Sequence, residues 1–203
     1  MWSVVDMPSK PIASGNFTFT PLEIEDVVLV ETRTFDDGRG FFMETYRADD
    51  FAAGGIDCTF VQDNQSQSTR GVLRGMHFQI EHPQAKLVRV ISGEIFDVAV
   101  DIRPESPTYG AWVGAVLSDE NRRQLFVPHG FAHGFLVMSP SATVCYKCDD
   151  IYHPGDEGGI AWDDPDVAID WPLEKAGLAK DALILSEKDR RRSSLRELDA
   201  SRA

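Results

Sequence analysis

Cysteine is scarce in this chain of 203 residues, which has only Cys58, Cys145 and Cys148. So few cysteines exclude a disulfide framework, and we expect a reducing, cytoplasmic location. Cys145 and Cys148 form one CxxC, but no second pair completes a tetrahedral zinc site. The surrounding run SATVCYKCDD alternates like a strand, in which positions three apart point to opposite faces. We therefore interpret both as ordinary strand cysteines.

Positive charge and long apolar runs are also lacking. The chain has 20 Lys+Arg against 33 Asp+Glu, a net charge of −13, and residues 149–170 hold eight acidic residues without a Lys or Arg. This balance argues against nucleic acid or an anionic membrane surface as a partner, because both require clustered positive charge. No apolar run approaches the roughly 20 residues that span a bilayer. Any anionic substrate must be met by a few locally placed Arg and Lys.

Helical patterns are few, and short alternating segments fill the chain from about residue 22 to residue 150. One of them alternates apolar positions from Phe96 to Ile102 with Asp97 and Asp101, the period-2 pattern of a half-buried strand. The segments predicted as strands are 27–35, 41–47, 86–91, 95–103, 123–128, 133–139 and 142–148. Short helices are expected at 47–55 and after Trp171. Many short strands predict an all-β sandwich or barrel.

Two histidines lie in strands punctuated by glycine: His77 in GVLRGMHFQ and His133 in VPHGFAHGF. The spacing from Pro128 to His133 matches the second motif of the cupin superfamily, a jelly roll built as a double-stranded β-helix. The first cupin motif requires His-x-His, but here Gln79 follows His77 at that spacing. A neutral amide is a poor ligand for iron or manganese, so a cupin without a metal is favoured over a metal-dependent one.

Five separated motifs make a more specific pattern. In chain order they are FVQDNQSQSTRGVLRGMHFQ, AKLVRVISGEIFDVAVDIR, RQLFVPHGFAHGFLV, YHPGDEGGIAWDDP and LSEKD. Together they resemble the dTDP-4-dehydrorhamnose 3,5-epimerase family over residues 22–190. The resemblance implies a cupin-type jelly roll with a few short helices, mainly C-terminal. It also implies an isomerase of dTDP-L-rhamnose biosynthesis that inverts C3 and C5 of dTDP-4-dehydro-6-deoxy-D-glucose, with no metal and no redox cofactor.

Such a reaction needs specific chemistry. The protons on C3 and C5 are both α to the C4 ketone, so an enzyme needs a base, a proton donor on the opposite face and a positive group near the ketone oxygen. His77 suits the base, since an ordinary histidine is largely neutral near pH 7. The resemblance implies that Asp189 pairs with this imidazole. It also implies that Lys86 lies near the enolate oxygen and that Tyr146 returns the proton.

The resemblance assigns eight further positions to the substrate site: Arg39, Phe41, Glu44, Gln62, Asn64, Arg74, His133 and Tyr152. The arginines match those that hold the pyrophosphate, a role that suits the guanidinium fork. Gln62, Asn64 and Glu44 match polar positions that meet the nucleotide. Phe41 and Tyr152 offer aromatic surface for thymine, and His133 lines the pocket. Members of the family are usually homodimers in which N-terminal strands reach the neighbouring site. Arg39, Phe41 and Glu44 therefore act either in cis or in trans.

We expect three parts along the chain: a flexible extension at 1–20, a cupin-type domain at 21–190 and a polar tail at 191–203. Three other functions stay open at this point. The first is a mono-epimerase that inverts C3 or C5 alone in another deoxysugar pathway. The second is a metal-dependent cupin oxygenase or isomerase that uses His77 and His133. The third is a sugar-binding cupin without catalysis.

Overall fold

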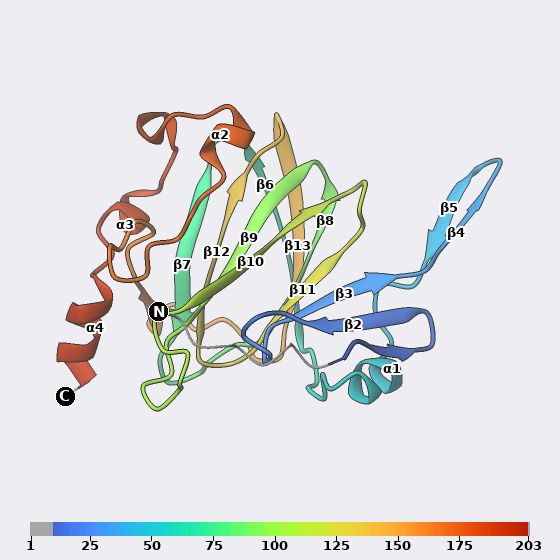
Figure 1. Ribbon diagram of the computed structural model, residues 1–203, viewed down its shortest axis with the longest axis horizontal. Helices are drawn as coiled ribbons and strands as arrows, with labels where there is room; N and C mark the ends of the chain where they lie inside the picture. Colours follow the sequence, from blue (N-terminus) through green and yellow to red (C-terminus); the bar gives the residue numbers. More distant parts are fainter. Residues whose placement is uncertain (1–9, 203) are drawn as a thin grey trace.

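Two antiparallel β-sheets packed face to face form the body of the protein (Figure 1). The structure, a computed structural model, describes residues 10–202. The larger sheet contains, in spatial order, β1 (Ile12–Ser14), β2 (Phe17–Pro21), β3 (Val28–Thr32), β11 (Gln124–Val127), β8 (Lys86–Ser92), β13 (Ser141–Cys148) and β6 (Gln62–Thr69). The smaller sheet contains β10 (Trp112–Ser118), β9 (Glu94–Asp101), β12 (Phe131–Val137), β7 (Leu73–Gln79) and β14 (Glu157–Gly159).

The remaining elements are a hairpin and short helices. The hairpin projects from the body in Figure 1, and the helices follow the sheets or connect them. These elements are β4 (Thr34–Asp37), β5 (Gly40–Met43), α1 (Ala48–Ala53), α2 (Leu173–Ala176), the 3₁₀ helix η1 (Lys180–Ala182), α3 (Glu187–Arg190) and α4 (Leu195–Arg202). The prediction of an all-β jelly roll with few, mainly C-terminal helices is confirmed. None of the helices in the described residues is long and apolar enough to cross a membrane.

The apolar alternation seen in the sequence forms the core between the sheets. Val88 and Val144 of the larger sheet pack in one cluster with Ala99 and Phe135 of the smaller sheet. On the other side of the smaller sheet, a second cluster joins Val98 of β9 to the C-terminal segment. Strand β9 is therefore buried on both faces, which explains why Asp97 and Asp101 are fully buried although the sequence pattern placed them on a polar face.

Strand β6 escaped the sequence analysis because its sequence, QDNQSQST, has no apolar alternation. Its residues still alternate in exposure: Gln62 and Asn64 are half-buried, and Asp63 and Gln65 are exposed. The inward face of β6 is polar because it lines a cavity, as described below. On the neighbouring β13, Cys148 is buried and Cys145 bonds to Gln65 on the outer surface, so the two cysteines face opposite sides as predicted.

The N-terminal residues extend the larger sheet, in contrast to the flexible extension expected for residues 1–20. Strands β1 and β2 pair with each other, and β2 pairs with β3. Phe17 and Phe19 of β2 are buried against Phe51 of α1, with ring centroids 5.1 Å apart in each pair and the rings packed edge to face. The folded part therefore begins well before residue 21, because these rings need burial. Residues 1–9 of that expected extension lie outside the described residues.

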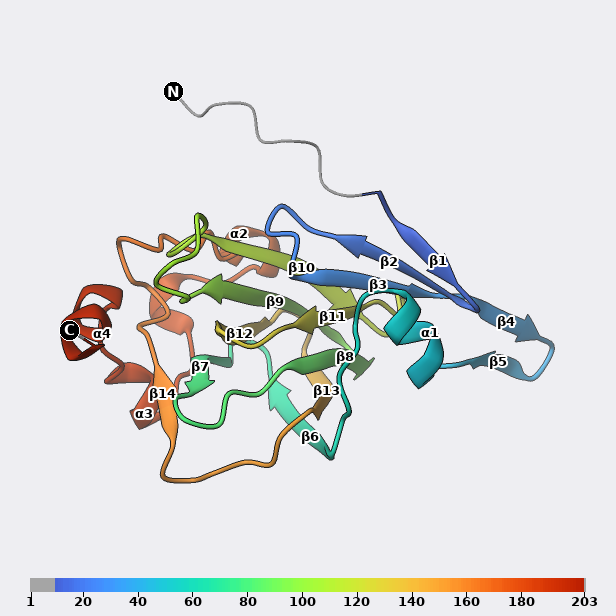
Figure 2. The ribbon, with the colours of Figure 1, turned by 90° about the horizontal axis from the view of Figure 1, so that it is seen from below.

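The C-terminal segment covers the outer face of the smaller sheet, at the opposite end of the molecule from α1 (Figure 2). Trp171 and Leu183 pack in the second cluster with Leu73 of β7. Leu195 of α4, within the expected polar tail 191–203, is buried in the same cluster. The domain therefore continues past residue 190. Its last helix is amphipathic, and a polar composition alone did not reveal the buried leucine.

The aromatic cluster around α1 gives the first testable prediction. Replacing Phe51, which is fully buried, by alanine removes a ring that packs on Phe17, Phe19 and Tyr46. We expect F51A to lower the free energy of unfolding by about 3–5 kcal/mol, measured by urea denaturation. The control I80A removes an exposed side chain and should cost less than about 0.5 kcal/mol. Equal losses in the two variants would contradict the packing of β1, β2 and α1 described above.

Candidate active site

Strand register places polar side chains of the larger sheet on its inner face. Lys86 of β8 lies opposite Cys148 of β13, and Tyr146, two residues before Cys148, lies opposite Asn64 of β6. Residues opposite each other, or two apart on one strand, point to the same face of a sheet. Lys86, Tyr146, Gln62 and Asn64 therefore share the face that looks toward the smaller sheet.

The smaller sheet presents His77 and Gln79 of β7 toward the same space. His77 lies opposite His133 of β12, and Gln79 lies opposite Glu157 of β14. The register of β7 on β12 shifts just beyond His77, where Gly75 faces Gly134. A Cβ atom on Gly75 would come within 2.6 Å of the Cα atom of Gly134, so only glycine allows this close approach. Gly75, two residues before His77, thus shapes the strand that carries it.

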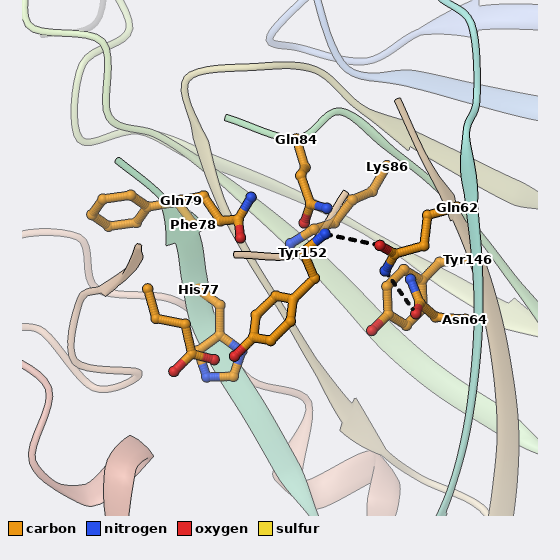
Figure 3. Close-up of a pocket in the computed structure, with 10 residues that line it drawn as sticks. Gln62, Asn64, His77, Phe78, Gln79, Gln84, Lys86, Tyr146 and Tyr152 are labelled. Carbon is orange, nitrogen blue, oxygen red and sulfur yellow. Dashed lines mark hydrogen bonds between the residues drawn. The ribbon is translucent and has the colours of Figure 1, made fainter. Parts of the chain in front are cut away.

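The two inner faces enclose a cavity of about 310 Å³ (Figure 3). Its lining comes from both sheets and from the loops that leave β7 and β13. The residues that line it are Gln62, Asn64, His77, Phe78, Gln79, Gln84, Lys86, Tyr146, Tyr152 and Glu157. In Figure 3 the ring of Tyr152 lies between His77 on one side and Tyr146 on the other. A ligand in this cavity would therefore meet the imidazole of His77 on one wall and the phenol of Tyr146 on the opposite wall.

A buried carboxylate supports His77. Nε2 of His77 lies 2.5 Å from Oδ1 of Asp189, which α3 brings to β7 from 112 residues further along the chain. The hydroxyl of Ser186 caps α3 by accepting from the backbone N–H of Asp189 and donates to Oδ2 of the same residue at 2.8 Å. Burial alone would raise the pKa of Asp189, but the bonds from His77 and Ser186 and the charge of Arg192 lower it overall. Asp189 therefore stays ionised beside the imidazole and fixes its tautomer.

Lys86 has a different environment. Burial lowers the pKa of its ammonium, and the nearby Cys148 and Asp97 oppose this only in part. An ammonium whose pKa is lowered gives up its proton more readily and bonds more strongly to a developing oxyanion. Lys86 is thus suited to stabilise negative charge inside the cavity.

Tyr146, on the wall opposite His77, is suited to hold a proton. Burial raises the pKa of its hydroxyl, and the positive charge of Arg74 opposes that rise only in part. Arg74 is near enough to Tyr146 to act on it electrostatically, and its Nε donates to the hydroxyl of Ser68 at 3.0 Å. The phenol therefore remains neutral near pH 7 and can act as an acid.

The predicted site residues fall into three groups in the structure. Gln62, Asn64, His77, Lys86, Tyr146 and Tyr152 line the cavity, with Asp189 bonded to His77 and Arg74 beside Tyr146. His133 is buried, and its Nε2 lies 2.7 Å from Oδ1 of Asp97, so its ring bonds within the smaller sheet and does not line the cavity. Arg39, Phe41 and Glu44 form the third group, away from the cavity.

The third group belongs to the projecting β4–β5 hairpin and the residue after it (Figure 1). Arg39 is highly exposed and forms an ion pair with Asp37. Phe41 is 54% exposed, with the Arg122 guanidinium 3.8 Å from its ring centroid. Glu44 bonds to Asn16 and Arg47. Within this chain, none of these three residues reaches the cavity.

Four lining residues were missed from the sequence: Phe78, Gln79, Gln84 and Glu157. A signal was available for two of them. Gln79 is two residues from His77 on the same strand, and Glu157 lies in one of the matched motifs and pairs with Gln79 in the sheet. Gln84 lies in the β7–β8 loop, whose conformation the sequence does not specify.

The cavity does not offer the ligand set of a cupin metal centre. The Nε2 atoms of His77 and His133 each bond to a carboxylate, Asp189 and Asp97 respectively. Within the described part of the chain, neither histidine belongs to a group of three side chains close enough to share an ion. The donor set around His77, which is one imidazole, amides and an ammonium, fits a proton-transfer site better than a metal site.

Comparison with known proteins shows similarity along most of the chain. The family described as dTDP-4-dehydrorhamnose 3,5-epimerase matches residues 21–197. A dTDP-4-dehydrorhamnose 3,5-epimerase from Methanothermobacter thermautotrophicus is 56% identical over 90% of this chain and 97% of its own length. One from Pseudomonas aeruginosa is 52% identical over 89% of this chain and 97% of its length.

Solved structures show the same similarity. A crystal structure of dTDP-6-deoxy-D-glucose-3,5-epimerase from Legionella pneumophila, in complex with dTDP-4-keto-L-rhamnose, is 47% identical to this chain with a TM-score of 0.85. The match covers 91% of this chain and 96% of that chain.

The ammonium of Lys86, which lines the cavity, gives a prediction about stability. Its pKa in the folded protein lies below that of the unfolded chain, about 10.4. Below both pKa values the charged group destabilises the folded state, and this cost disappears as the pH rises between them. We expect K86M to be more stable than the wild type at pH 7, and the difference to shrink as the pH approaches 10.

Urea unfolding of both proteins between pH 7 and pH 10 measures this difference. The exposed Lys175, changed to methionine in the same way, should alter stability by less than about 0.5 kcal/mol at every pH. A K86M protein that is less stable than the wild type at pH 7 would show that the ammonium has a net stabilising partner.

Proposed function

This chain belongs to the dTDP-4-dehydrorhamnose 3,5-epimerase family, and we propose that its cavity performs the isomerisation for which that family is named. The enzyme inverts C3 and C5 of dTDP-4-dehydro-6-deoxy-D-glucose and forms dTDP-4-dehydro-L-rhamnose, in dTDP-L-rhamnose biosynthesis. The observation that carries this proposal is the His77–Asp189 pair on one wall of the cavity, with Tyr146 on the other wall and Lys86 in the lining between the sheets. All three cysteines are free, which accords with action in the reducing cytoplasm.

Proton abstraction is the first step. Neutral His77 takes the proton from the carbon next to the C4 ketone, and the electron pair of the C–H bond moves onto the C4 oxygen as an enolate. Asp189, held ionised, stabilises the imidazolium that forms. The ammonium of Lys86 stabilises the enolate oxygen. The charges lie between the two sheets, where water screens them less than in bulk solvent, and this strengthens both interactions.

Proton return on the opposite face completes each inversion. Tyr146 lies on the sheet opposite His77 and keeps its proton near neutral pH. It donates this proton to the enolate carbon from the face that His77 does not reach, and the C4 ketone forms again. Because C3 and C5 both flank C4, the same base and acid serve both carbons when the sugar ring turns in the cavity. His77 loses its proton to solvent, and Tyr146 regains one, before the next inversion.

The nucleotide half of the substrate binds at the open side of the cavity. Gln62 and Asn64 bond to each other, and the side-chain oxygen of Gln62 accepts from the backbone N–H of Tyr152 at 2.8 Å. This holds the half-exposed ring of Tyr152 at the rim, where it offers a stacking surface for thymine. Arg74, beside Tyr146, supplies positive charge for the pyrophosphate.

The protein acts as a homodimer in which the β4–β5 hairpin completes the partner's site. The hairpin exposes Phe41 and Phe42 by 54% and 65%, a large apolar surface for an isolated ribbon. The hairpin, which carries Arg39 in its turn, projects from the two sheets (Figure 1), and Arg39 is not among the residues that line the cavity of its own chain. A twofold dimer would place each hairpin against the other subunit, so that Arg39, Phe41 and Glu44 act in trans.

Isotope exchange tests the reaction. Incubating the purified protein with dTDP-4-dehydro-6-deoxy-D-glucose in heavy water should place deuterium at both C3 and C5, as read by NMR and mass spectrometry. Each inversion exchanges the carbon-bound proton with solvent, because His77 and Tyr146 are different groups. Deuterium at one carbon only would indicate a mono-epimerase, and no incorporation would contradict epimerisation altogether.

The variant H77N keeps the shape of the site but removes the base. It should lower kcat by roughly 10²–10⁴-fold while changing dTDP affinity little. H129N, at a half-exposed histidine that pairs with Asp149, is the matched control and should retain wild-type kcat. A wild-type rate in H77N would leave a sugar-binding role for the cavity.

Mixing two inactive variants tests the hairpin. If the hairpin acts in trans, a mixed dimer of H77N and R39A contains one site with both an intact cavity and an intact hairpin. After denaturation and joint refolding, about a quarter of all sites should then be active. If the hairpin acts in cis, the mixture should show no activity beyond the sum of the two variants. Sedimentation velocity on the same samples reports the dimer directly.

A further inference from the structure

Two histidines and an aspartate meet at the rim of the cavity without a part in the proposed reaction. His82 lies in the loop between β7 and β8, and Asp150 and His153 lie in the loop between β13 and β14. One ligand atom from each of the three side chains lies within 4.8 Å of the others. The imidazole rings stack with centroids 4.0 Å apart and planes inclined by 16°, and Nδ1 of His82 is 3.8 Å from Oδ2 of Asp150. We propose that this group binds a divalent transition-metal ion of the zinc class.

A buried glutamine holds the two histidines in place. The side-chain amide of Gln79 donates to the backbone carbonyl of His82 at 2.7 Å and accepts from the backbone N–H of His153 at 2.7 Å. Gln79 is 7% exposed, so water does not compete for these bonds. One side chain therefore fixes the distance between the two loops at the residues that carry the imidazoles. Such support around ligands typically raises metal affinity.

The aspartate is held in the same manner. Oδ1 of Asp150 accepts from the backbone N–H of Ile151 at 2.7 Å, which leaves Oδ2 directed toward His82. Gln84 donates to the backbone carbonyl of Asp150 at 2.7 Å and ties the residue to the β7–β8 loop. On the other side, the carboxylate of Asp156 accepts from the backbone N–H groups of Glu81 and His82. All three ligand residues are thus anchored through their backbones.

The donor set selects the class of ion. Two imidazoles and one carboxylate suit zinc and its neighbours, whereas calcium and magnesium require mostly oxygen ligands. Binding turns the stacked rings so that one nitrogen of each faces the ion, about 2.0–2.1 Å away, and water supplies a fourth ligand. The carboxylate balances part of the ion's charge.

The ion would link two loops at the rim of the cavity and would not lie inside the cavity. It would join the loop that carries Gln84 to the loop that carries Tyr152, two residues that line the cavity (Figure 3). Binding a ligand to the folded state alone also raises the temperature of unfolding. The role is therefore structural and lies outside the proton-transfer machinery.

Titration of the full-length protein with ZnCl₂ tests the proposal. Isothermal titration calorimetry should show one ion per chain for the wild type, and saturating ZnCl₂ should raise the unfolding temperature. H82A and H153A should each weaken the binding at least about tenfold. H129A, which removes a half-exposed histidine outside the group, should bind as the wild type does. CoCl₂ gives a second measurement, because a four-coordinate site produces visible absorption bands that both variants should lose.

Three outcomes would overturn the proposal: no saturable binding of Zn²⁺ to the wild type, unchanged affinity in either H82A or H153A, or an equal loss in H129A. Circular dichroism of each variant, compared with that of the wild type, tests whether a loss of zinc binding comes from unfolding. Neither His82 nor His153 has a place in the proposed reaction. Zinc binding can therefore be tested whether or not the protein shows epimerase activity.

Discussion

Antiparallel strand register is the constraint on which the rest of the structure depends. The pairings of β13 with β8 on one side and with β6 on the other bring Lys86, Tyr146 and Asn64 to a common face. A slip of one residue in β13 would turn Tyr146 to the outer surface and bring Cys145 or Lys147 to the face that lines the cavity. The apolar neighbours Val88 and Val144 are buried on the same face, so the core itself enforces the register that aligns the site. The same packing that stabilises the fold therefore also sets the positions of the site residues.

Burial has opposite effects on the ionisable groups in and around the cavity. It lowers the pKa of Lys86 and raises that of Tyr146, because each loses water around its charged form. Asp189 escapes the same effect because His77 and Ser186 bond to its carboxylate. Lys86 is therefore a more acidic ammonium, Tyr146 keeps its proton and Asp189 stays ionised. Together these groups support the formation of an enolate and its reprotonation.

Several of the acidic side chains in residues 149–170 accept hydrogen bonds from backbone N–H groups of the loops. In the acidic stretch 149–170, Asp149 accepts from the backbone N–H of Ala85, and Asp156 accepts from that of His82. Asp164 is buried and accepts from the backbone N–H groups of Val167 and Leu195. These carboxylates satisfy backbone donors that no strand satisfies. The net charge of −13 thus coexists with a cavity lined by Lys86 and with the positive charge of Arg74 near Tyr146.

The sequence by itself determined most of the strands between residues 27 and 148 and the short helix at 47–55, because periodicity is a property of neighbouring residues. It missed β6, whose inward side chains are polar, and also β2 and β10. Its bounds for the domain did not include the phenylalanines of β2 or Leu195, which are buried near the two ends. No local pattern pairs Asp189 with His77; the family resemblance implied this pair, and the tertiary structure brings the two side chains into contact. Only the tertiary structure revealed the bond between His133 and Asp97 and the stacking of His82 on His153. Each of these pairs comes from separate segments, and their meeting depends on sheet order and loop bonds that no local pattern encodes.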